Sequence, residues 1–161
     1  MTLNIPKTIK FVITDFDGII TDNCVYVDSK GEMSRKINFK DIMAFSILKK
    51  NGYKIGIISG EANSAIELLK EKFDIEEIHQ KIRTKIDVLK SIVVKYNLTQ
   101  DEYIYIGDDV NDIESLKFSK YAFTVPEAVK KVKEIENIQI TSANGGNGAF
   151  REIVDCLLEQ S

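Results

Sequence analysis

The chain has 161 residues, of which 43% are hydrophobic and 29% are charged, a composition ordinary for a soluble globular protein. Its formal net charge of −3, with Lys and Arg spread along the chain, argues against a dedicated nucleic-acid or membrane-surface binder. The sequence contains no long uncharged apolar run and no signal-peptide pattern, and Cys24 and Cys156 lack metal-type spacing. We therefore expect a cytoplasmic protein with reduced thiols.

Apolar residues recur in short continuous runs that predict strands and at helical spacing that predicts helices. Asp41 is placed to cap one helix, Pro126 to open another, and the glycine-rich segment 144–148 is expected to be a flexible loop. The predicted elements, in chain order, are a strand over 9–15, a β-hairpin over 24–38, a helix over 41–51, a strand over 53–59, a helix over 63–73, a short strand near 78, a helix over 84–97, a strand over 103–106, a short helix over 111–118, a strand over 121–125, a helix from 126, a strand over 138–141 and a helix over 149–158.

Strands that alternate with helices predict an α/β fold, a doubly wound, Rossmann-like parallel sheet with helices on both faces. No repeat or linker divides the chain, so we expect one domain over residues 1–161, with the hairpin as a flap and no separate cap domain. Ligands bind such sheets at the carboxyl ends of the strands.

Two acidic residues, Asp15 and Asp17, follow the first predicted strand, and Gly18 then interrupts the pattern. Carboxylates so close together repel each other, and keeping both in a partly buried crevice is costly unless a cation binds there. Magnesium suits such a site and brings phosphate with it, because it prefers carboxylates, water and phosphate oxygens. The plain alternative is a strand end followed by an ordinary Asp-Gly turn.

Two further predicted strands also end in residues that suit phosphate chemistry. One ends at Ser59-Gly60 and the other is followed by Asp108-Asp109, while Lys85 begins the helix between them. If these ends meet at one crevice, they supply the nucleophile, hydroxyl, backbone N–H and cation that attack on a phosphoryl group requires. Taken singly, the same residues also fit strand punctuation, a solvated lysine and a helix cap.

Four motifs in this order resemble the signatures of the haloacid dehalogenase superfamily of phosphotransferases. They are D-F-D-G-I-I-T-D from Asp15, S-G at Ser59, Lys85, and G-D-D-V-N-D from Gly107. The short capless chain, the early hairpin and the closing G-G-N-G-A-F-R-E are similar to the 3-deoxy-D-manno-octulosonate 8-phosphate (KDO 8-phosphate) phosphatase family. The resemblance implies a magnesium-dependent phosphatase that hydrolyses the phosphate monoester of a 2-keto-3-deoxy sugar acid through an aspartyl-phosphate.

The resemblance also implies a role for each matching residue. Asp15 would be the nucleophile, Asp17 the general acid and then the base, and Lys85 the cation that balances charge on the nucleophile and the phosphoryl group. Magnesium would be held by Asp15, the backbone carbonyl of Asp17, and Asp108. Substrate or phosphate contacts are expected from Asp17, Ser59, Gly60, Lys85, Asn111, Glu61 and Lys72, while Asp109 and Asp112 are expected to orient the ligands or the lysine.

Individual positions and the missing cap domain lead to expectations about the substrate and the oligomeric state. Glu61 looks more like the enzymes for sialic-acid-type substrates, so an N-acylneuraminate or KDN 9-phosphate is an alternative. In some relatives a lysine on this helix reaches the site of a neighbouring subunit and binds the carboxylate of the sugar there. Lys72 falls at the position where such a lysine is expected. Capless relatives close their sites by oligomerising, so we expect a homotetramer whose hairpins pack together and in which a neighbouring subunit covers each site.

Two functions of other classes are alternatives on the same fold, and the motifs of this chain argue against both. A non-catalytic oligomerisation domain has no need of the intact set Asp15, Asp17, Lys85 and Asp108. A phospho-accepting receiver domain carries its acidic pair on the first strand and its phosphorylated aspartate later, which is the opposite order to this chain.

Overall fold

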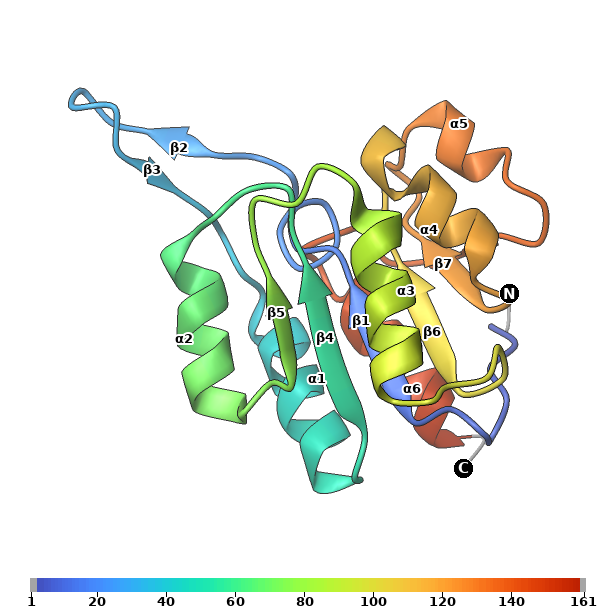
Figure 1. The fold of residues 1–161 in the computed structure, drawn as a ribbon. Helices are drawn as coiled ribbons and strands as arrows, with labels where there is room; N and C mark the ends of the chain where they lie inside the picture. The colour runs from blue at the N-terminus through green and yellow to red at the C-terminus, as the bar shows by residue number, and fades with distance from the viewer. Residues whose placement is uncertain (1–2, 160–161) are drawn as a thin grey trace.

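The computed structural model describes residues 3–159, which form a six-stranded parallel sheet between helices, together with a two-stranded hairpin (Figure 1). The strand order is β5-β4-β1-β6-β7-β8. The strands are β1 (Phe11–Thr14), β2 (Tyr26–Val27), β3 (Met33–Ser34), β4 (Lys54–Ile58), β5 (Glu77–His79), β6 (Tyr103–Ile106), β7 (Ala122–Thr124) and β8 (Gln139–Ile140). The helices are α1 (Phe39–Lys50), α2 (Ser64–Phe73), α3 (Lys85–Lys95), the 3₁₀ turn η1 (Val110–Asp112), α4 (Ile113–Phe118), α5 (Lys130–Lys133) and α6 (Ala149–Glu159). The predicted α/β class is confirmed.

Strand β1 lies in the middle of the sheet because its side chains suit burial on both faces. All of Phe11 to Thr14 is buried, and β4 and β6 pair with it in parallel on either side. From this point β4 and β5 extend the sheet one way, and β6, β7 and β8 extend it the other way. The carboxyl end of β1 is therefore the topological switch point, where sheets of this kind bind ligands.

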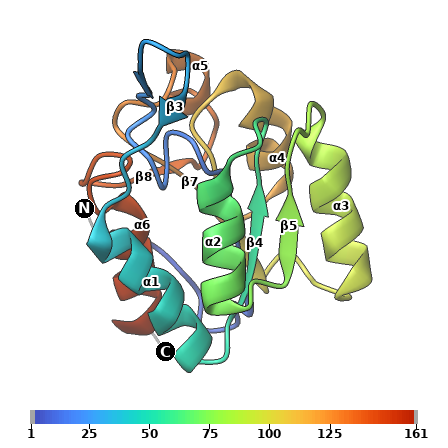
Figure 2. The same cartoon turned by 90° about the vertical axis from the view of Figure 1, so that its left-hand side faces the viewer.

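The helices form two layers, one on each face of the sheet (Figures 1 and 2). Helix α1 packs against α2 and α6 on one face, and α3 packs against α4 on the other. The first layer is held by aromatic contacts, since the Phe45 ring lies 5.8 Å from that of Phe73 and 4.8 Å from that of Phe150. Helices α2 and α3 each follow a parallel strand, so they begin at the same edge of the sheet as the end of β1.

Two predicted helix starts are wrong. Asn38 caps α1 by accepting the Lys40 N–H at 2.8 Å, which leaves Asp41 free to accept the N–H groups of Gly148 and Arg151 and to cap α6 instead. Pro126 lies in a turn, and α5 begins only at Lys130. The Val129 N–H donates to the Asp108 carbonyl at 3.1 Å, which ties this segment to the loop after β6 and delays the helix.

The glycine-rich segment 144–148, expected to be a flexible loop, packs against the loop that follows β1. The Gly146 N–H donates to the Ile19 carbonyl at 2.9 Å. A Cβ on Gly145 would lie 1.9 Å from the Gly18 carbonyl oxygen, and φ at Gly146 is +64°. Glycine is required at both positions because only a bare backbone permits this approach and this conformation. The segment therefore supports the end of β1 from within the subunit.

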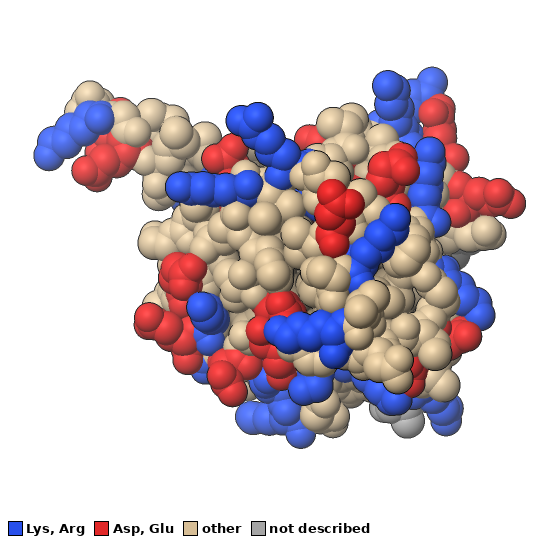
Figure 3. All heavy atoms as spheres, viewed as in Figure 1, with Lys and Arg blue, Asp and Glu red and all other residues tan. Residues whose placement is uncertain are grey.

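The hairpin of β2 and β3 projects from the body of the molecule beside the start of α2 (Figure 1). Its strands pair in antiparallel register, with Tyr26 opposite Ser34 and Val27 opposite Met33. Tyr26 and Met33 are 63% and 64% exposed, so the hairpin presents apolar side chains to solvent. Elsewhere on the face seen in Figure 3, acidic and basic side chains are interspersed. Among residues 3–159 no helix is long and apolar enough to span a membrane.

Candidate active site

The loop after β1 places Asp15 at the base of a crevice. The Asp15 N–H bonds the Ile106 carbonyl at 2.8 Å, which continues the β1–β6 ladder by one residue, and the chain then turns. The Phe16 carbonyl accepts the N–H groups of Ile19, Ile20 and Thr21, which closes the turn. Gly18 has φ of +90°, and a Cβ there would lie 2.0 Å from the Asp108 carboxylate. The turn therefore needs glycine to bring the loops after β1 and β6 together.

Lys85 lies beneath Asp15 and is the cation of the site. Its Nζ is 2.8 Å from Asp15 Oδ2 and 2.9 Å from Asp112 Oδ1, and its side chain is fully buried. Burial by itself lowers the pKa of Lys85, but the charges of Asp112 and Asp15 outweigh burial and raise it, so the ammonium stays protonated. A buried lysine between two carboxylates is a costly arrangement that a purely structural core avoids.

Asp112 is held by four donors and so fixes the position of Lys85. Besides the lysine, the Tyr105 hydroxyl donates to Asp112 Oδ1 at 2.8 Å, and the N–H groups of Asp108 and Asp109 donate to Oδ2 at 3.2 and 3.3 Å. Burial, followed by the charges of Asp112 and Asp15, raises the pKa of Tyr105 well above its ordinary value. Tyr105 therefore remains a hydrogen-bond donor over the whole physiological pH range.

The carboxylates of this crevice fit a divalent cation. Asp15, Asp108 and Asp112 each offer an oxygen within 4.8 Å of the others. Asp108 Oδ1 is buried and has no hydrogen-bond partner among the described residues. Burial, together with Asp112 and Asp109, raises the pKa of Asp108 to about 7, and burial also raises the pKa of Asp15 well above its ordinary value. An unpartnered carboxylate oxygen among like charges is the arrangement that a bound cation relieves.

Asp17 is positioned separately from this buried group. Its Oδ1 accepts hydrogen bonds from Arg35 Nε at 2.8 Å and from the Thr21 hydroxyl at 3.2 Å, and its Oδ2 accepts one from Arg35 Nη2 at 3.4 Å. Arg35 follows β3 directly, so the base of the hairpin is tied to the loop after β1. The side chain of Asp17 is 25% exposed and lines the same crevice as Asp15.

A cavity of about 150 Å³ brings most of the predicted site residues together. It is lined by Asp15, Asp17, Asn23, Ser59, Gly60, Glu61, Asp108, Asp109 and Asn111. Lys85 and Asp112 lie behind its floor, joined to Asp15 by the ion pairs described above. Lys72, by contrast, lies in the last turn of α2 with its Nζ 5.4 Å from the centre of its neighbour's ring, Phe73, and does not line this cavity.

Sequence reasoning missed three residues that the fold brings to the site. Arg35 contacts Asp17, Asn23 lines the cavity and donates to Asp108 Oδ2 at 3.4 Å, and Tyr105 contacts Asp112. Tyr105 had a usable signal, because a residue at the end of a strand before Gly107-Asp108 stands close to the acidic loop. Arg35 had none, since only the path of the hairpin decides where it points.

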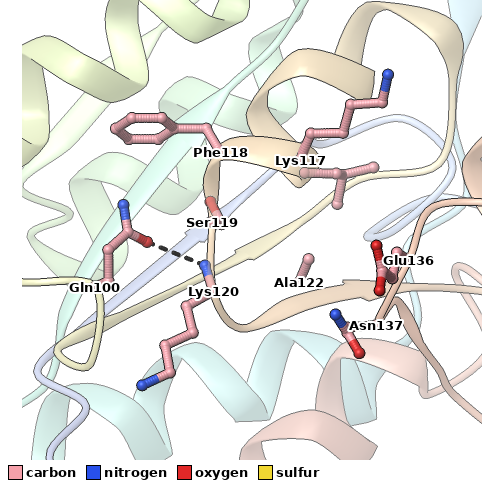
Figure 4. A pocket seen from close by; sticks show the side chains of 9 residues that line it. Gln100, Lys117, Phe118, Ser119, Lys120, Ala122, Glu136 and Asn137 are labelled. Carbon is pink, nitrogen blue, oxygen red and sulfur yellow. Dashed lines mark hydrogen bonds between the residues drawn. The ribbon is translucent and has the colours of Figure 1, made fainter.

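A larger cavity, of about 460 Å³, lies at the opposite edge of the sheet, between the end of α4 and the starts of β7 and β8 (Figure 4). Lys117 and Lys120 extend in different directions from it, and Lys120 pairs with Asp101 at 2.6 Å. Its one acidic lining residue is Glu136. This cavity lacks the convergent carboxylates of the crevice at the end of β1, so the crevice is the candidate active site.

The fold and this crevice define an enzyme of the haloacid dehalogenase-like class. The family model of haloacid dehalogenase-like hydrolases matches residues 58–153, which is more than half of the chain. The chain belongs to this family. The resemblance noted from its four motifs is therefore confirmed.

Within this family, the chain is similar to proteins that share one name. The chain is 28% identical, over 95% of its own length and 84% of the other, to the 3-deoxy-D-manno-octulosonate 8-phosphate phosphatase of Haemophilus influenzae. The structure of the Moraxella catarrhalis enzyme of that name, in complex with magnesium, phosphate and KDO, superposes with a TM-score of 0.89, with 26% identity over 96% of this chain and 88% of that one. The cobalt-bound Haemophilus influenzae phosphatase superposes with a TM-score of 0.87, with 27% identity over 96% of this chain and 90% of that one.

Proposed function

We propose that this protein is a magnesium-dependent phosphatase that hydrolyses KDO 8-phosphate. The observation that carries the proposal is the group of Asp15, Lys85 and Asp108 at the switch point of the sheet, with Lys85 Nζ 2.8 Å from Asp15 Oδ2. A carboxylate beside a buried cation and a second, unpartnered carboxylate suits nucleophilic attack on a phosphoryl group. The relatives named for KDO 8-phosphate supply the substrate class.

The proposed reaction has two steps on the side chains of this chain. In the first, an Asp15 carboxylate oxygen attacks phosphorus, the bond from phosphorus to the sugar oxygen breaks, and Asp17 gives that oxygen its proton. In the second, Asp17 takes a proton from water, which attacks the aspartyl-phosphate and releases inorganic phosphate and free Asp15. Ser59 and the Gly60 N–H would hold phosphate oxygens, and Lys85 would balance their charge throughout.

Magnesium would be held by Asp15, the backbone carbonyl of Asp17, and Asp108. Asp108 Oδ1 is the best candidate ligand because it is buried and unpartnered, whereas Asp112 already accepts four hydrogen bonds. The ion would supply positive charge beside the phosphate oxygens. Asp109 and Asp112 would orient this group, since they form a capping box around η1.

A nine-carbon acid is the second candidate substrate. Glu61 lines the cavity directly after Gly60, in the position that suggested an N-acylneuraminate or KDN 9-phosphate. Both candidate substrates present the same chemistry at the reacting end, a phosphate monoester on a primary alcohol. The two substrates differ only in the part of the sugar that lies far from the phosphate. A direct comparison of the hydrolysis rates of the two esters is therefore needed to decide between them.

We propose further that the chain assembles into a homotetramer in which a neighbouring subunit covers each site. The hairpin leaves Tyr26, Val27 and Met33 about 60% exposed or more, and Leu68 of α2 is 64% exposed beside it. Apolar side chains gathered on a projecting element are typical of an association surface. Light scattering should give about four times the 18.2 kDa of one chain. A monomer at micromolar concentration would contradict this assembly.

The first experiment is phosphate release from KDO 8-phosphate and from N-acetylneuraminate 9-phosphate, each with magnesium. Asp15→Asn serves as the blank and Asp101→Asn, a change to a half-exposed aspartate outside the site, as the matched control. Release that depends on Asp15, and a preference for KDO 8-phosphate, supports the proposal. Equal activity in Asp15→Asn would overturn the mechanism, and no release by the folded wild type from either ester would favour the non-catalytic domain.

A further inference from the structure

The hydrogen bonds of Asp17 compete with the role proposed for it. Arg35 takes both of its carboxylate oxygens, Oδ1 through Nε at 2.8 Å and Oδ2 through Nη2 at 3.4 Å, and Thr21 shares Oδ1. A general acid must reach the leaving oxygen with one of these atoms. Arg35 therefore has to leave Asp17, at least in part, before the sugar oxygen can be protonated.

Arg35 also lines a groove that leads away from the catalytic cavity. This groove, of about 450 Å³, lies between the base of the hairpin and the start of α2, and its walls are Met33, Ser34, Arg35, Asn63, Ser64, Ala65 and Leu68. The two spaces lie close together where Arg35, which lines the groove, contacts Asp17, which lines the catalytic cavity. Along the chain, Asn63 of the groove comes two residues after Glu61 of the cavity.

Two side chains of the groove suit a ligand that carries both a carboxylate and hydroxyl groups. The side chain of Arg35 is 14% exposed, so its guanidinium is partly free of water and bonds an incoming carboxylate more strongly than a surface arginine does. Asn63 Nδ2, on the facing wall, is buried and has no hydrogen-bond partner among the described residues. The other arginines lie elsewhere, Arg151 in an ion pair with Asp155 on α6 and Arg83 in the loop before α3.

We propose that Arg35 is a specificity-determining residue that exchanges Asp17 for the carboxylate of the substrate. This inference rests on the proposed function, which supplies a sugar acid as substrate. When the sugar acid lies in the groove, its carboxylate draws the guanidinium away and frees an Asp17 oxygen for the leaving group. The phosphate of a neutral sugar has no carboxylate to place in the groove and leaves Arg35 on Asp17. Binding of a sugar acid as substrate is thus coupled to release of Asp17 from Arg35.

The test compares the phosphate ester of a sugar acid with that of a neutral sugar, here called the acid and the neutral ester, in magnesium buffer. Values of kcat and KM are measured for KDO 8-phosphate and for glucose 6-phosphate, using wild type, Arg35→Met, Arg35→Lys and the matched control Arg151→Met. Methionine keeps most of the length of the side chain without its charge. We expect the ratio of kcat/KM for acid over neutral ester to fall at least about tenfold in Arg35→Met, with a raised KM for the acid. Arg35→Lys should recover part of the ratio, and Arg151→Met should keep it.

A binding measurement keeps the proposal testable if turnover is slow. Titration calorimetry with KDO itself, which has the carboxylate but no phosphate, should show weaker binding to Arg35→Met than to Arg151→Met. A ratio within twofold of wild type together with unchanged KDO binding would overturn the inference. An equal loss on both esters would also overturn it, since Arg35 would then only support Asp17. If the wild type hydrolyses no sugar-acid phosphate at all, the proposed function fails, which is a different result.

Discussion

The hydroxyl of Tyr105 offers the sharpest test of how the buried site is built. It donates to Asp112 Oδ1 at 2.8 Å, and the same oxygen accepts Lys85 Nζ at 2.9 Å, so the hydroxyl helps to fix the lysine that faces Asp15. Tyr103, two residues earlier on β6, is a natural control. It is also fully buried, but its hydroxyl donates to the neutral side chain of Gln100 at 3.0 Å.

The change to phenylalanine removes one hydroxyl at each position and little apolar area. A hydrogen bond to a charged group is worth about 1.5–3 kcal/mol, and a neutral one about 0.5–1.5 kcal/mol. Tyr105→Phe should therefore lower the free energy of unfolding by about 1 kcal/mol more than Tyr103→Phe does, as measured by urea denaturation. It should also lower kcat several-fold, because Lys85 gains freedom, while Tyr103→Phe keeps kcat. Equal losses of stability with kcat intact in both variants would refute this account of Tyr105.

Other predictions follow from the buried charges and the hairpin. The pKa of Asp108 is raised from 3.8 to about 7, so the folded metal-free protein binds this proton more tightly than the unfolded chain. Its stability should fall as pH rises from about 4 to about 7, by at most about 4 kcal/mol from this group, and Asp108→Asn should flatten that dependence in denaturation at several pH values. Magnesium should raise the melting temperature of the wild type at pH 8 and should do so much less in Asp108→Asn; an equal rise would remove Asp108 from the ligand set. Lys85→Met should leave the buried carboxylates of Asp15 and Asp112 without their cation and lower the free energy of unfolding by about 3–5 kcal/mol in urea; a loss below about 1 kcal/mol would contradict this. Met33→Glu should reduce the mass measured by light scattering while leaving the unfolding free energy per chain within about 0.5 kcal/mol, because Met33 is 64% exposed; an unchanged mass would place the hairpin outside the interface.

Several features of the site were predictable because local sequence decides them. The apolar run of β1 has to be buried on both faces, so Asp15 and Asp17 come at its end and therefore at the edge where parallel strands bind ligands. The alternation of strands and helices determines the class of sheet, and the short apolar run of β6 places Asp108 at the same edge. These inferences need only the period of the pattern and the residue at which each run stops.

The helix starts show where local reasoning fails. Asp41 and Pro126 both have side chains that suit the first turn of a helix, yet neither begins one. Asn38 already occupies the cap position of α1, and the carboxylate of Asp41 is required by the amino end of α6, more than a hundred residues later. Contacts over such separations are decided by packing between layers, which has no local signature in the sequence.

The sequence by itself determined the class of fold, the edge of the sheet at which the acidic residues gather and most of the residues that line the crevice there, because strand ends and motif spacings are local properties. Only the tertiary structure decided how those residues are held. It buried Lys85 between Asp15 and Asp112, left Asp108 Oδ1 without a partner and brought Arg35 from the hairpin onto Asp17. Burial and distance between segments far apart in the chain set these interactions, and both arise only when the layers pack together.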